Sequence, residues 1–309
     1  MRYRVEIVML GTGATIPTRE RLTPSILVRD WLGSKVLLDA GEGAQLRLSQ
    51  AGASPASIDL IAISHEHGDH VNGLPGLLQS MYIGGRRAPL TLIAPESIAW
   101  YAREALEASE EKLGFKVNIV EIRKRGSMEV GGALDKLTIK WFPVCHNIEA
   151  YGFRLEWTLR PRIEEEKLEA LGLKPGPWLR ELIEKGETTV ENRKIKLEDV
   201  EARKHAKITV TYTGDTSPCE EIVKDIEKTK ILIHDSTYSQ DMEKEAKERG
   251  HSTSKQAAQQ AAKAETETLI LTHISARYSG VEARKLQKEA RETFRKTILA
   301  WDNMKIIIP

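Results

Sequence analysis

Cysteine is the scarcest residue of this 309-residue chain, which contains only Cys145 and Cys219. Two thiols in a chain of this length cannot form the disulfide framework of a small secreted domain. A reducing compartment, such as the cytoplasm, is the simplest interpretation. The sequence also lacks any run of 18 apolar residues, and the residues that follow Met1 do not form an apolar signal segment. We therefore expect a cytoplasmic protein without a membrane partner.

An excess of charge of one sign is also missing. The chain has 46 Lys and Arg against 45 Asp and Glu, a formal net charge of +1. This balance excludes a strong overall attraction to nucleic acid, and no DNA partner is expected; any RNA contact must come from local basic patches. A hydrophobic content of 40% and a charged content of 29% are typical of a soluble globular protein. The Lys- and Glu-rich composition is a feature shared with proteins from hot habitats.

Histidine is sparse, yet three of the eight histidines fall within residues 65–70. The apolar run Leu60–Ile63 predicts a buried strand, which leads directly into His65-Glu66-His67-Gly68-Asp69-His70. Neutral imidazoles and a carboxylate are ligands that suit zinc and similar ions. A solvated surface loop could carry the same residues, but an apolar strand that ends at them favours a metal site.

Other predicted strands also end at a histidine or an aspartate, namely at His146, Asp215 and His273. Active sites of layered αβ proteins gather at such strand ends. Asp39 either caps the predicted helix 44–50 or supports the metal loop, and capping is the favoured interpretation. The candidate ligand set therefore comprises His65, His67, Asp69, His70, His146, Asp215 and His273.

This set is too large for one tetrahedral zinc and fits two metal ions. Two neighbouring ions acidify a bridging water and stabilise charge on a phosphoryl group. Asp69 can also accept a proton from the nucleophile. One ion would be held by His65, His67 and His146 and the other by Asp69, His70 and His273, with Asp215 as the bridge.

Two further side chains near these strand ends invite a chemical interpretation. His251 follows Gly250 before a predicted helix, where it is either a cap residue or a general acid for a leaving oxygen, with Asp235 to orient it. Cys145 stands beside His146, but strand alternation points it to the opposite face. We therefore expect Cys145 to be a small buried thiol.

A change of character marks residues 156–207, where 12 basic and 12 acidic residues occur among 52. A thin apolar stripe runs through this segment and is broken by Lys174-Pro175-Gly176-Pro177. The apolar surface is too small to predict an independent core. We expect a protruding arm of two short helices and a hairpin; the alternative is a disordered charged insertion.

The remaining pattern alternates strands and helices along the chain. Strands are predicted at 4–10, 25–29, 35–39, 90–94, 117–122, 137–144, 151–155, 208–212, 231–233, 269–271 and 304–308, and helices at 96–112, 218–229, 239–248, 254–263 and 281–296. Ser217 is expected to cap the helix 218–229, and Ser252 or Ser254 the helix that ends at 263.

Several short strings occur in order along nearly the whole chain. They are Gly11-Thr12-Gly13 with Pro17-x-Arg19-x-Arg21, His65–His70 with Gly73-Leu74-Pro75-Gly76-Leu77-Leu78, Gly172-Leu173-x-Pro175-Gly176-Pro177, Thr213–Thr216, His234–Thr237, Gly250–Thr253 and Thr272–Tyr278. The histidine pattern resembles the metallo-β-lactamase superfamily, and the strings together resemble ribonuclease Z, the family of transfer-RNA 3′-processing endonucleases. The sequence departs from the family pattern in that Leu22 replaces an Asn and Asp235 replaces the usual Glu.

This resemblance implies an α/β protein with a metallo-β-lactamase fold, a four-layer αββα sandwich in one domain spanning 1–309, with an exosite arm inserted at about 156–207. It implies an endoribonuclease that removes the 3′ trailer from precursor tRNA, leaving a 3′-hydroxyl on the tRNA and a 5′-phosphate on the trailer. Two Zn²⁺ ions per subunit are implied, with His251 as proton donor held by Asp235. A homodimer is also implied, in which the arm of one subunit clamps RNA for the other subunit's site. The implied RNA contacts are Arg19, Arg21, Pro175, Gly176, Pro177 and Arg277.

Two other functions compete with this one. A small-molecule metallo-hydrolase, such as a phosphodiesterase or lactonase, would use the same metals, but it has no use for the arm. A non-catalytic RNA-binding or scaffolding protein would be expected to lose ligands, whereas the ligand set here is intact.

Overall fold

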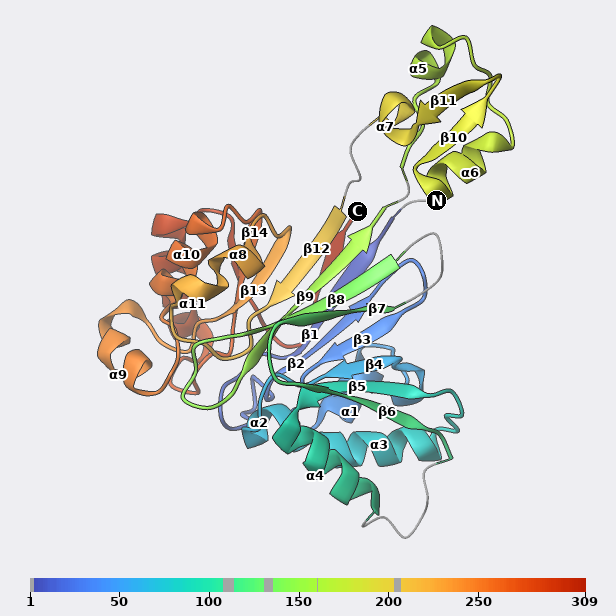
Figure 1. The fold of residues 1–309 in the computed structure, drawn as a ribbon. Coiled ribbons are helices and arrows are strands. Elements are labelled where there is room, and N and C mark those ends of the chain that lie inside the picture. The colour runs from blue at the N-terminus through green and yellow to red at the C-terminus, as the bar shows by residue number, and fades with distance from the viewer. Residues whose placement is uncertain (1–2, 108–113, 131–135, 160, 203–206) are drawn as a thin grey trace. The chain divides into compact units, whose positions relative to one another are not determined.

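The structure is a computed structural model that describes residues 3–107, 114–130, 136–159, 161–202 and 207–309 (Figure 1). It divides into two compact units. The first unit comprises residues 1–127, 139–155 and 209–309, and the second comprises 128–138 and 156–208. None of the helices in the described ranges has the length and apolar character needed to cross a membrane.

The first six strands and the last strand of the chain form a mixed seven-stranded sheet, in the order β16-β1-β2-β3-β4-β5-β6. Pairing is antiparallel from β16 to β3 and parallel from β3 to β6. The strands are β1 (Val5–Gly11), β2 (Ser25–Arg29), β3 (Lys35–Leu38), β4 (Leu60–Ala62), β5 (Leu90–Pro95), β6 (Val117–Ile122) and β16 (Met304–Ile308).

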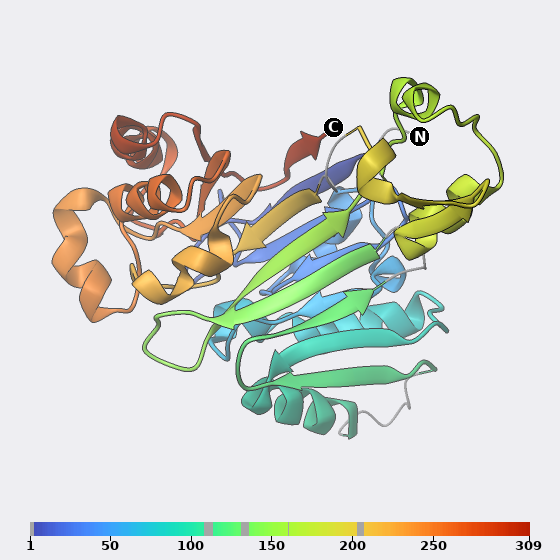
Figure 2. The same ribbon diagram turned by 45° about the horizontal axis from the view of Figure 1, so that its top comes forward.

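Both faces of this sheet are buried. Val8 and Leu27 belong to an apolar cluster with side chains of α1 (Ala44–Gln50), α3 (Leu74–Ile83) and α4 (Glu96–Glu107). Their neighbours Ile7 and Ile26 point to the other face because strand side chains alternate, and they too are at most 1% exposed. Helices therefore cover one face, and the second sheet covers the other (Figures 1 and 2).

The second seven-stranded sheet has the order β15-β14-β13-β12-β9-β8-β7, and β12 to β15 are parallel. Its apolar outer cluster includes Leu232 and Leu271 and packs against alanines of α10 (Ser254–Lys263) and Leu286 of α11 (Gly280–Thr293). The layer order is that of the predicted αββα sandwich. The strands are β7 (Gly126–Val130), β8 (Lys136–Pro143), β9 (Tyr151–Thr158), β12 (Lys207–Tyr212), β13 (Ile231–Asp235), β14 (Thr268–Thr272) and β15 (Thr297–Leu299).

The second unit contains the predicted pair of helices and hairpin. These are α5 (Glu165–Ala170), α6 (Trp178–Lys185) and the hairpin β10 (Glu187–Val190)–β11 (Arg193–Lys196), followed by α7 (Leu197–Val200). The expectation that this segment lacks a core is wrong, because six apolar side chains are at most 5% exposed and form one cluster. They are Leu168, Leu173, Leu182, Ile195, Leu197 and Val200. Residues 203–206, including His205, lie outside the described residues.

Several predicted helix ends differ from the structure. The helix predicted at 218–229 is a 3₁₀ turn, Glu220–Ile222, followed by α8 (Val223–Ile226), and Ser217 does not cap it. The residue that caps α10 is Thr253, whose side chain accepts a hydrogen bond from the backbone of Gln256. Strands β7 and β15 were not predicted.

The two cysteines are the clearest correction. Cys145 and Cys219 form a disulfide, with their Cα atoms 6.1 Å apart, and neither is a free thiol. Cys145 is half-buried rather than buried. The alternation argument failed because Cys145 lies beyond the end of β8, in a loop where side chains no longer alternate.

Candidate metal centre

The histidine loop is held by close backbone packing against the loop after β3. The backbone N–H of Ala40 donates to the carbonyl of His70, and the N–H of Gly73 donates to the carbonyl of Ala40, both at 2.9 Å. A Cβ on Gly41 would lie 2.4 Å from the carbonyl oxygen of Asp69, and one on Gly73 would lie 2.1 Å from the carbonyl oxygen of Gly41. Both glycines are therefore needed for the short helix α2 (Gly68–Val71) to sit where it presents Asp69 and His70.

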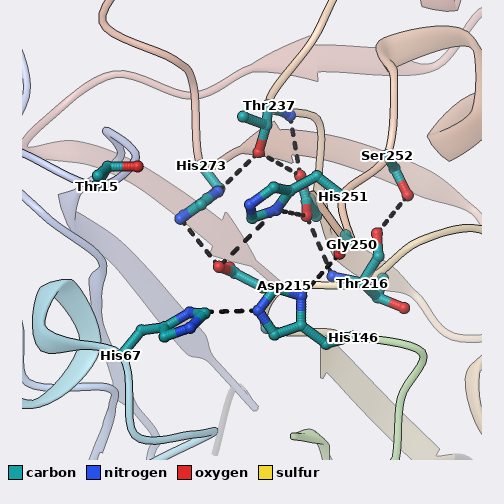
Figure 3. A network of polar contacts seen from close by, with 12 residues as sticks. Thr15, His67, His146, Asp215, Thr216, Thr237, Gly250, His251, Ser252 and His273 are labelled. Atoms are coloured by element: carbon teal, nitrogen blue, oxygen red, sulfur yellow. Dashed lines mark hydrogen bonds and ion pairs between the residues drawn. The ribbon is translucent and has the colours of Figure 1, made fainter. Parts of the chain in front are cut away.

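Three imidazoles of the predicted first metal site converge in the first unit, and Figure 3 shows two of them, His67 and His146, pointing at each other. His67 Nδ1 lies 3.1 Å from His65 Nε2 and 3.3 Å from His146 Nε2, and His65 Nε2 lies 3.6 Å from Asp215 Oδ2. Ligand atoms about 2.1 Å from one tetrahedral zinc are about 3.4 Å apart. Nitrogen atoms that point at one another at this spacing fit a shared cation.

Asp215 also faces the predicted second site. His273 Nε2 lies 3.2 Å from Asp215 Oδ2 and 3.3 Å from Asp69 Oδ2, and His70 Nε2 lies 3.3 Å from Asp215 Oδ1. Within the described residues, His70 Nε2 and Asp215 Oδ1 are buried and have no hydrogen-bond partner. Two buried ligand atoms that face each other at 3.3 Å without a hydrogen bond fit a pair of ions that share Asp215.

Asp39 holds the histidine loop and does not cap a helix. Helix α1 begins after Gly43 and has no side-chain cap. Instead, Asp39 accepts hydrogen bonds from the Ser64 backbone at 2.7 Å and the Ser64 hydroxyl at 2.9 Å, and from the Tyr212 hydroxyl at 2.7 Å. It also pairs with His70 Nδ1 at 2.7 Å. The carboxylate therefore accepts a hydrogen bond from Nδ1–H of His70, which leaves Nε2 as the ligand atom.

His146 and His273 are oriented in the same way. His146 Nδ1 donates to the carbonyl of Gly250 at 2.7 Å. The Thr237 hydroxyl donates to Asp235 at 2.7 Å, so its oxygen can accept from His273 Nδ1, 2.8 Å away. In both cases Nε2 faces the centre, as a ligand histidine requires. Thr237 was missed in the sequence, although it belongs to a string quoted for the resemblance.

Backbone conformation is unusual at two positions of the centre. Asp39 and His273 both have φ of 57°, in the left-handed region that residues with a side chain seldom adopt. Each such residue costs on the order of 1 kcal/mol. The surrounding hydrogen bonds offset this cost, and the unusual backbone turns both side chains toward the site.

Electrostatics at the centre favour a bound cation. Burial would raise the pKa of Asp215 and Asp69, but neighbouring histidines, His273 and His70 among them, hold both values well below the usual range. Burial would lower the pKa of His70, yet Asp215, Asp39 and Asp69 raise it well above the usual value. A metal cation placed among these groups would offset the negative charge of the buried carboxylates.

His251 stands beside the two ligand groups and is not part of the convergent first set. Its Nδ1 pairs with Asp235 Oδ2 at 2.8 Å, so an aspartate at position 235 reaches His251 although its side chain is shorter than the usual glutamate. Asp235 is fully buried and is itself held by the Thr216 and Thr237 backbones, at 3.1 and 2.9 Å. Burial would lower the pKa of His251, but Asp235 raises it to about 9. The pair is therefore arranged to keep a protonated imidazole beside Asp215.

The residues implied as RNA contacts have different surroundings. Arg19 is exposed, and Arg277 is exposed and paired with Glu245. Arg21 is only 9% exposed and donates to the Thr12 hydroxyl and to the carbonyl of Ala300, so the structure does not support its assignment to RNA.

Two further placements complete the comparison with the predicted site. Pro175, Gly176 and Pro177 lie in the second unit, just before and at the start of α6. A residue that the sequence did not reveal is Thr15, whose backbone N–H binds Asp69 Oδ2 at 2.8 Å. A backbone donor carries no residue-type signal, so only the fold could show it.

Comparisons with known proteins identify the family of this chain. The family model of the anti-Pycsar protein Apyc1 matches residues 5–160, and that of the beta-lactamase superfamily domain matches residues 200–274. Ribonuclease Z of Aeropyrum pernix is 52% identical over 306 residues, 99% of each chain. Ribonuclease Z of Ignicoccus hospitalis is 36% identical over 99% of each chain. The crystal structure of the short form of human tRNase Z aligns with a TM-score of 0.71, 24% identity, and coverage of 98% of this chain and 99% of that one.

Fold and site together define a metallo-β-lactamase-fold hydrolase, with two mixed sheets between helical layers and clusters of histidine and aspartate that can bind metal. The histidine clusters alone do not distinguish one family of that superfamily from another. Sequence identity over the full length of the chain does distinguish them, and it shows that the chain belongs to the ribonuclease Z family of endoribonucleases. The predicted family and fold are confirmed, and the alternative of a small-molecule hydrolase is not favoured.

Proposed function

We propose that this chain removes the 3′ trailer from precursor tRNA by a single hydrolytic cut, leaving a 3′-hydroxyl on the tRNA and a 5′-phosphate on the trailer. The observation that carries the proposal is the joint placement of two ligand groups around Asp215 with the His251–Asp235 pair beside them. Hydrolysis of a phosphodiester needs charge stabilisation on the phosphoryl group and a proton for the leaving oxygen. This arrangement supplies a place for each.

We propose two Zn²⁺ ions as the resident metals, because imidazole-rich groups of this spacing suit zinc. When bound, the ions would acidify the attacking water and neutralise charge on the phosphoryl oxygens. One ion would be held by His65, His67 and His146 and the other by Asp69, His70 and His273, with Asp215 shared by both.

The protein's own groups would perform the proton transfers. Asp69 is anionic, is held by the Thr15 backbone, and is placed to accept the proton that the attacking water releases. His251, whose Nδ1 is held by Asp235, would donate from Nε2 to the 3′ oxygen as it leaves the phosphorus. An alkoxide is a poor leaving group, so a positioned acid should contribute on the order of 10²–10⁴-fold in rate.

End-labelled precursor tRNA, incubated with and without a chelator, tests the overall reaction. The labelled 5′ product should carry a 3′-hydroxyl, and its formation should stop when metal is removed. Cleavage that persists in a metal-free protein would refute the proposal.

The variant His251→Ala tests the proposed proton donor. It should keep its metals and its RNA binding but lose most of its turnover on precursor tRNA. A nitrophenyl phosphodiester has a leaving group that needs no proton, so the variant should recover much of its activity on that substrate. Equal damage on both substrates, or loss of metal, would show that His251 has a structural role.

We further propose that the enzyme acts in the cytoplasm as a homodimer, and that residues 156–207 form the exosite arm for the RNA of the partner subunit. A disulfide such as Cys145–Cys219 also occurs in intracellular proteins of hyperthermophiles, and the Lys- and Glu-rich composition of this chain is a feature shared with such proteins. Size determination in solution, with and without the arm, tests the assembly.

A further inference from the structure

One acidic side chain near the metal centre holds two arginines at once. Glu245, on α9 (Glu243–Glu248), accepts from Arg277 at 2.7 and 3.1 Å and pairs with Arg249 Nε at 3.4 Å. The arginine side chains are 46% and 63% exposed, and that of Glu245 is 29% exposed. Glu245, Arg249 and Arg277 together form a cationic group with a net charge of +1, and this charge is accessible to solvent.

This group is tied to the proton donor of the proposed reaction. The guanidinium carbon of Arg277 lies 5.5 Å from the centre of the Tyr238 ring, and that ring lies 6.2 Å from the His251 ring. Arg249 is two residues before His251 in the chain. The backbone N–H of His251 donates to Ala246 of α9 at 2.8 Å, so the loop that carries both side chains is anchored to the helix.

The position of His251 determines which part of the substrate reaches this group. His251 would protonate the leaving 3′ oxygen, which belongs to the last nucleotide of the mature tRNA. Arg277 is one aromatic ring, that of Tyr238, away from His251, so the cationic group would face that nucleotide. The next anion along the strand is the phosphate on the 5′ side of that nucleotide. This step rests on the proposed function, and in particular on His251 as the donor.

The chemistry of the group suits a phosphate. A guanidinium has five N–H donors in a planar fork that matches phosphate oxygens. Arg277 donates two N–H groups to Glu245 and one to Met242 Sδ, and Arg249 forms an ion pair with Glu245 through Nε. Because each guanidinium has five N–H donors, both side chains have further donors for a ligand. The carboxylate also holds the two guanidinium groups together, which reduces the entropy that they would lose on binding.

We propose that Arg249 and Arg277, aligned by Glu245, bind the phosphate immediately 5′ of the scissile phosphate. Arg249 is then a substrate-positioning residue that fixes the terminal nucleotide against His251. Its side chain is 63% exposed and pairs with Glu245, which is not a candidate metal ligand, so its replacement should leave the fold and the metals unchanged.

A double-substitution experiment tests this contact. Precursor tRNA with a neutral methylphosphonate at the phosphate 5′ of the cleavage site is compared with the natural substrate, for the wild type and for Arg249→Ala. On the natural substrate, Arg249→Ala should lower kcat/KM on the order of 10- to 100-fold, the range for a lost hydrogen bond to a charged group. On the methylphosphonate substrate, the same variant should cause little further loss, because the contact is already absent.

The control is Arg123→Ala. Arg123 is a 65%-exposed arginine that also pairs with carboxylates, Glu96 and Glu121, and it should behave as wild type on both substrates. Salt dependence gives a second measurement: the slope of log affinity against log salt should decrease by about 0.7 in Arg249→Ala, the value for one phosphate contact of a single strand. Independent, multiplicative losses from the two substitutions, or an unchanged salt slope, would overturn the proposal. Failure of the wild type to cleave natural precursor tRNA would instead refute the proposed function.

Discussion

The disulfide between Cys145 and Cys219 should be a major source of stability, and its removal is a direct test. In the chain-entropy description, a crosslink restricts the unfolded chain in proportion to the logarithm of the loop that it closes. The two cysteines are 74 residues apart, and this separation corresponds to about 4 kcal/mol at 25 °C. We expect Cys145→Ser combined with Cys219→Ser to lower the free energy of unfolding by approximately that amount.

The native contacts around the bond should survive this change. The N–H of Ser217 donates to the carbonyl of Cys145 at 2.7 Å, and the N–H of Cys145 donates to the Thr216 hydroxyl at 3.2 Å. These bonds hold the two loops together without the sulfur atoms. The loss should therefore arise mainly in the unfolded chain, and activity at low temperature should remain.

Unfolding in guanidinium chloride, extrapolated linearly to water, measures the effect. Wild-type protein with its disulfide reduced should match the double variant, and the variant itself should not respond to reductant. A difference below about 1 kcal/mol between oxidised wild type and the variant would refute the entropic argument. Two reactive thiols in unfolded, unreduced wild type would show that the bond does not form.

Three other predictions follow from the centre and from the second unit. Elemental analysis should find two zinc-class ions per chain, and Asp215→Ala should lose both, because Asp215 faces both ligand groups; a variant that retains two tightly bound ions would refute the shared-ligand scheme. Asp39→Asn should weaken metal binding about 10- to 100-fold by disturbing the Nδ1 partner of His70, which a competition titration with a chelator would detect; unchanged affinity would show that Asp39 acts only on folding. Deletion of residues 160–202 should leave hydrolysis of a small phosphodiester intact but weaken tRNA binding, and equal RNA affinity in the shortened protein would contradict the role of the arm.

The sequence predicted the candidate ligands because side chains that bind metals follow directly after apolar runs that predict strands. Each apolar strand was recognisable, and the residue types at its end were uncommon enough to stand out, as with His146 after β8 and His273 after β14. The fold class was implied by the resemblance of the sequence strings to ribonuclease Z, and the alternation of strands and helices agreed with it. The structure brings all seven candidate ligands into one unit.

The features that were missed depend on contacts between distant residues. The disulfide joins positions 74 residues apart, and nothing local marks either cysteine. Asp39 was expected to cap α1 because the next helix begins close by, but a backbone φ of 57° turns its side chain toward Ser64 and His70. Arg21 resembled an exposed loop cation, whereas its guanidinium is buried against Thr12 and Ala300.

The disulfide also encloses the entire inserted segment in sequence. Residues 156–208 of the second unit lie between Cys145 and Cys219. A protease that cuts once within this segment would therefore leave two polypeptides that remain covalently joined, and they would separate on a denaturing gel only after reduction. During synthesis the bond can form only after the whole insertion has left the ribosome, so oxidation of this pair reports that the insertion has been fully made.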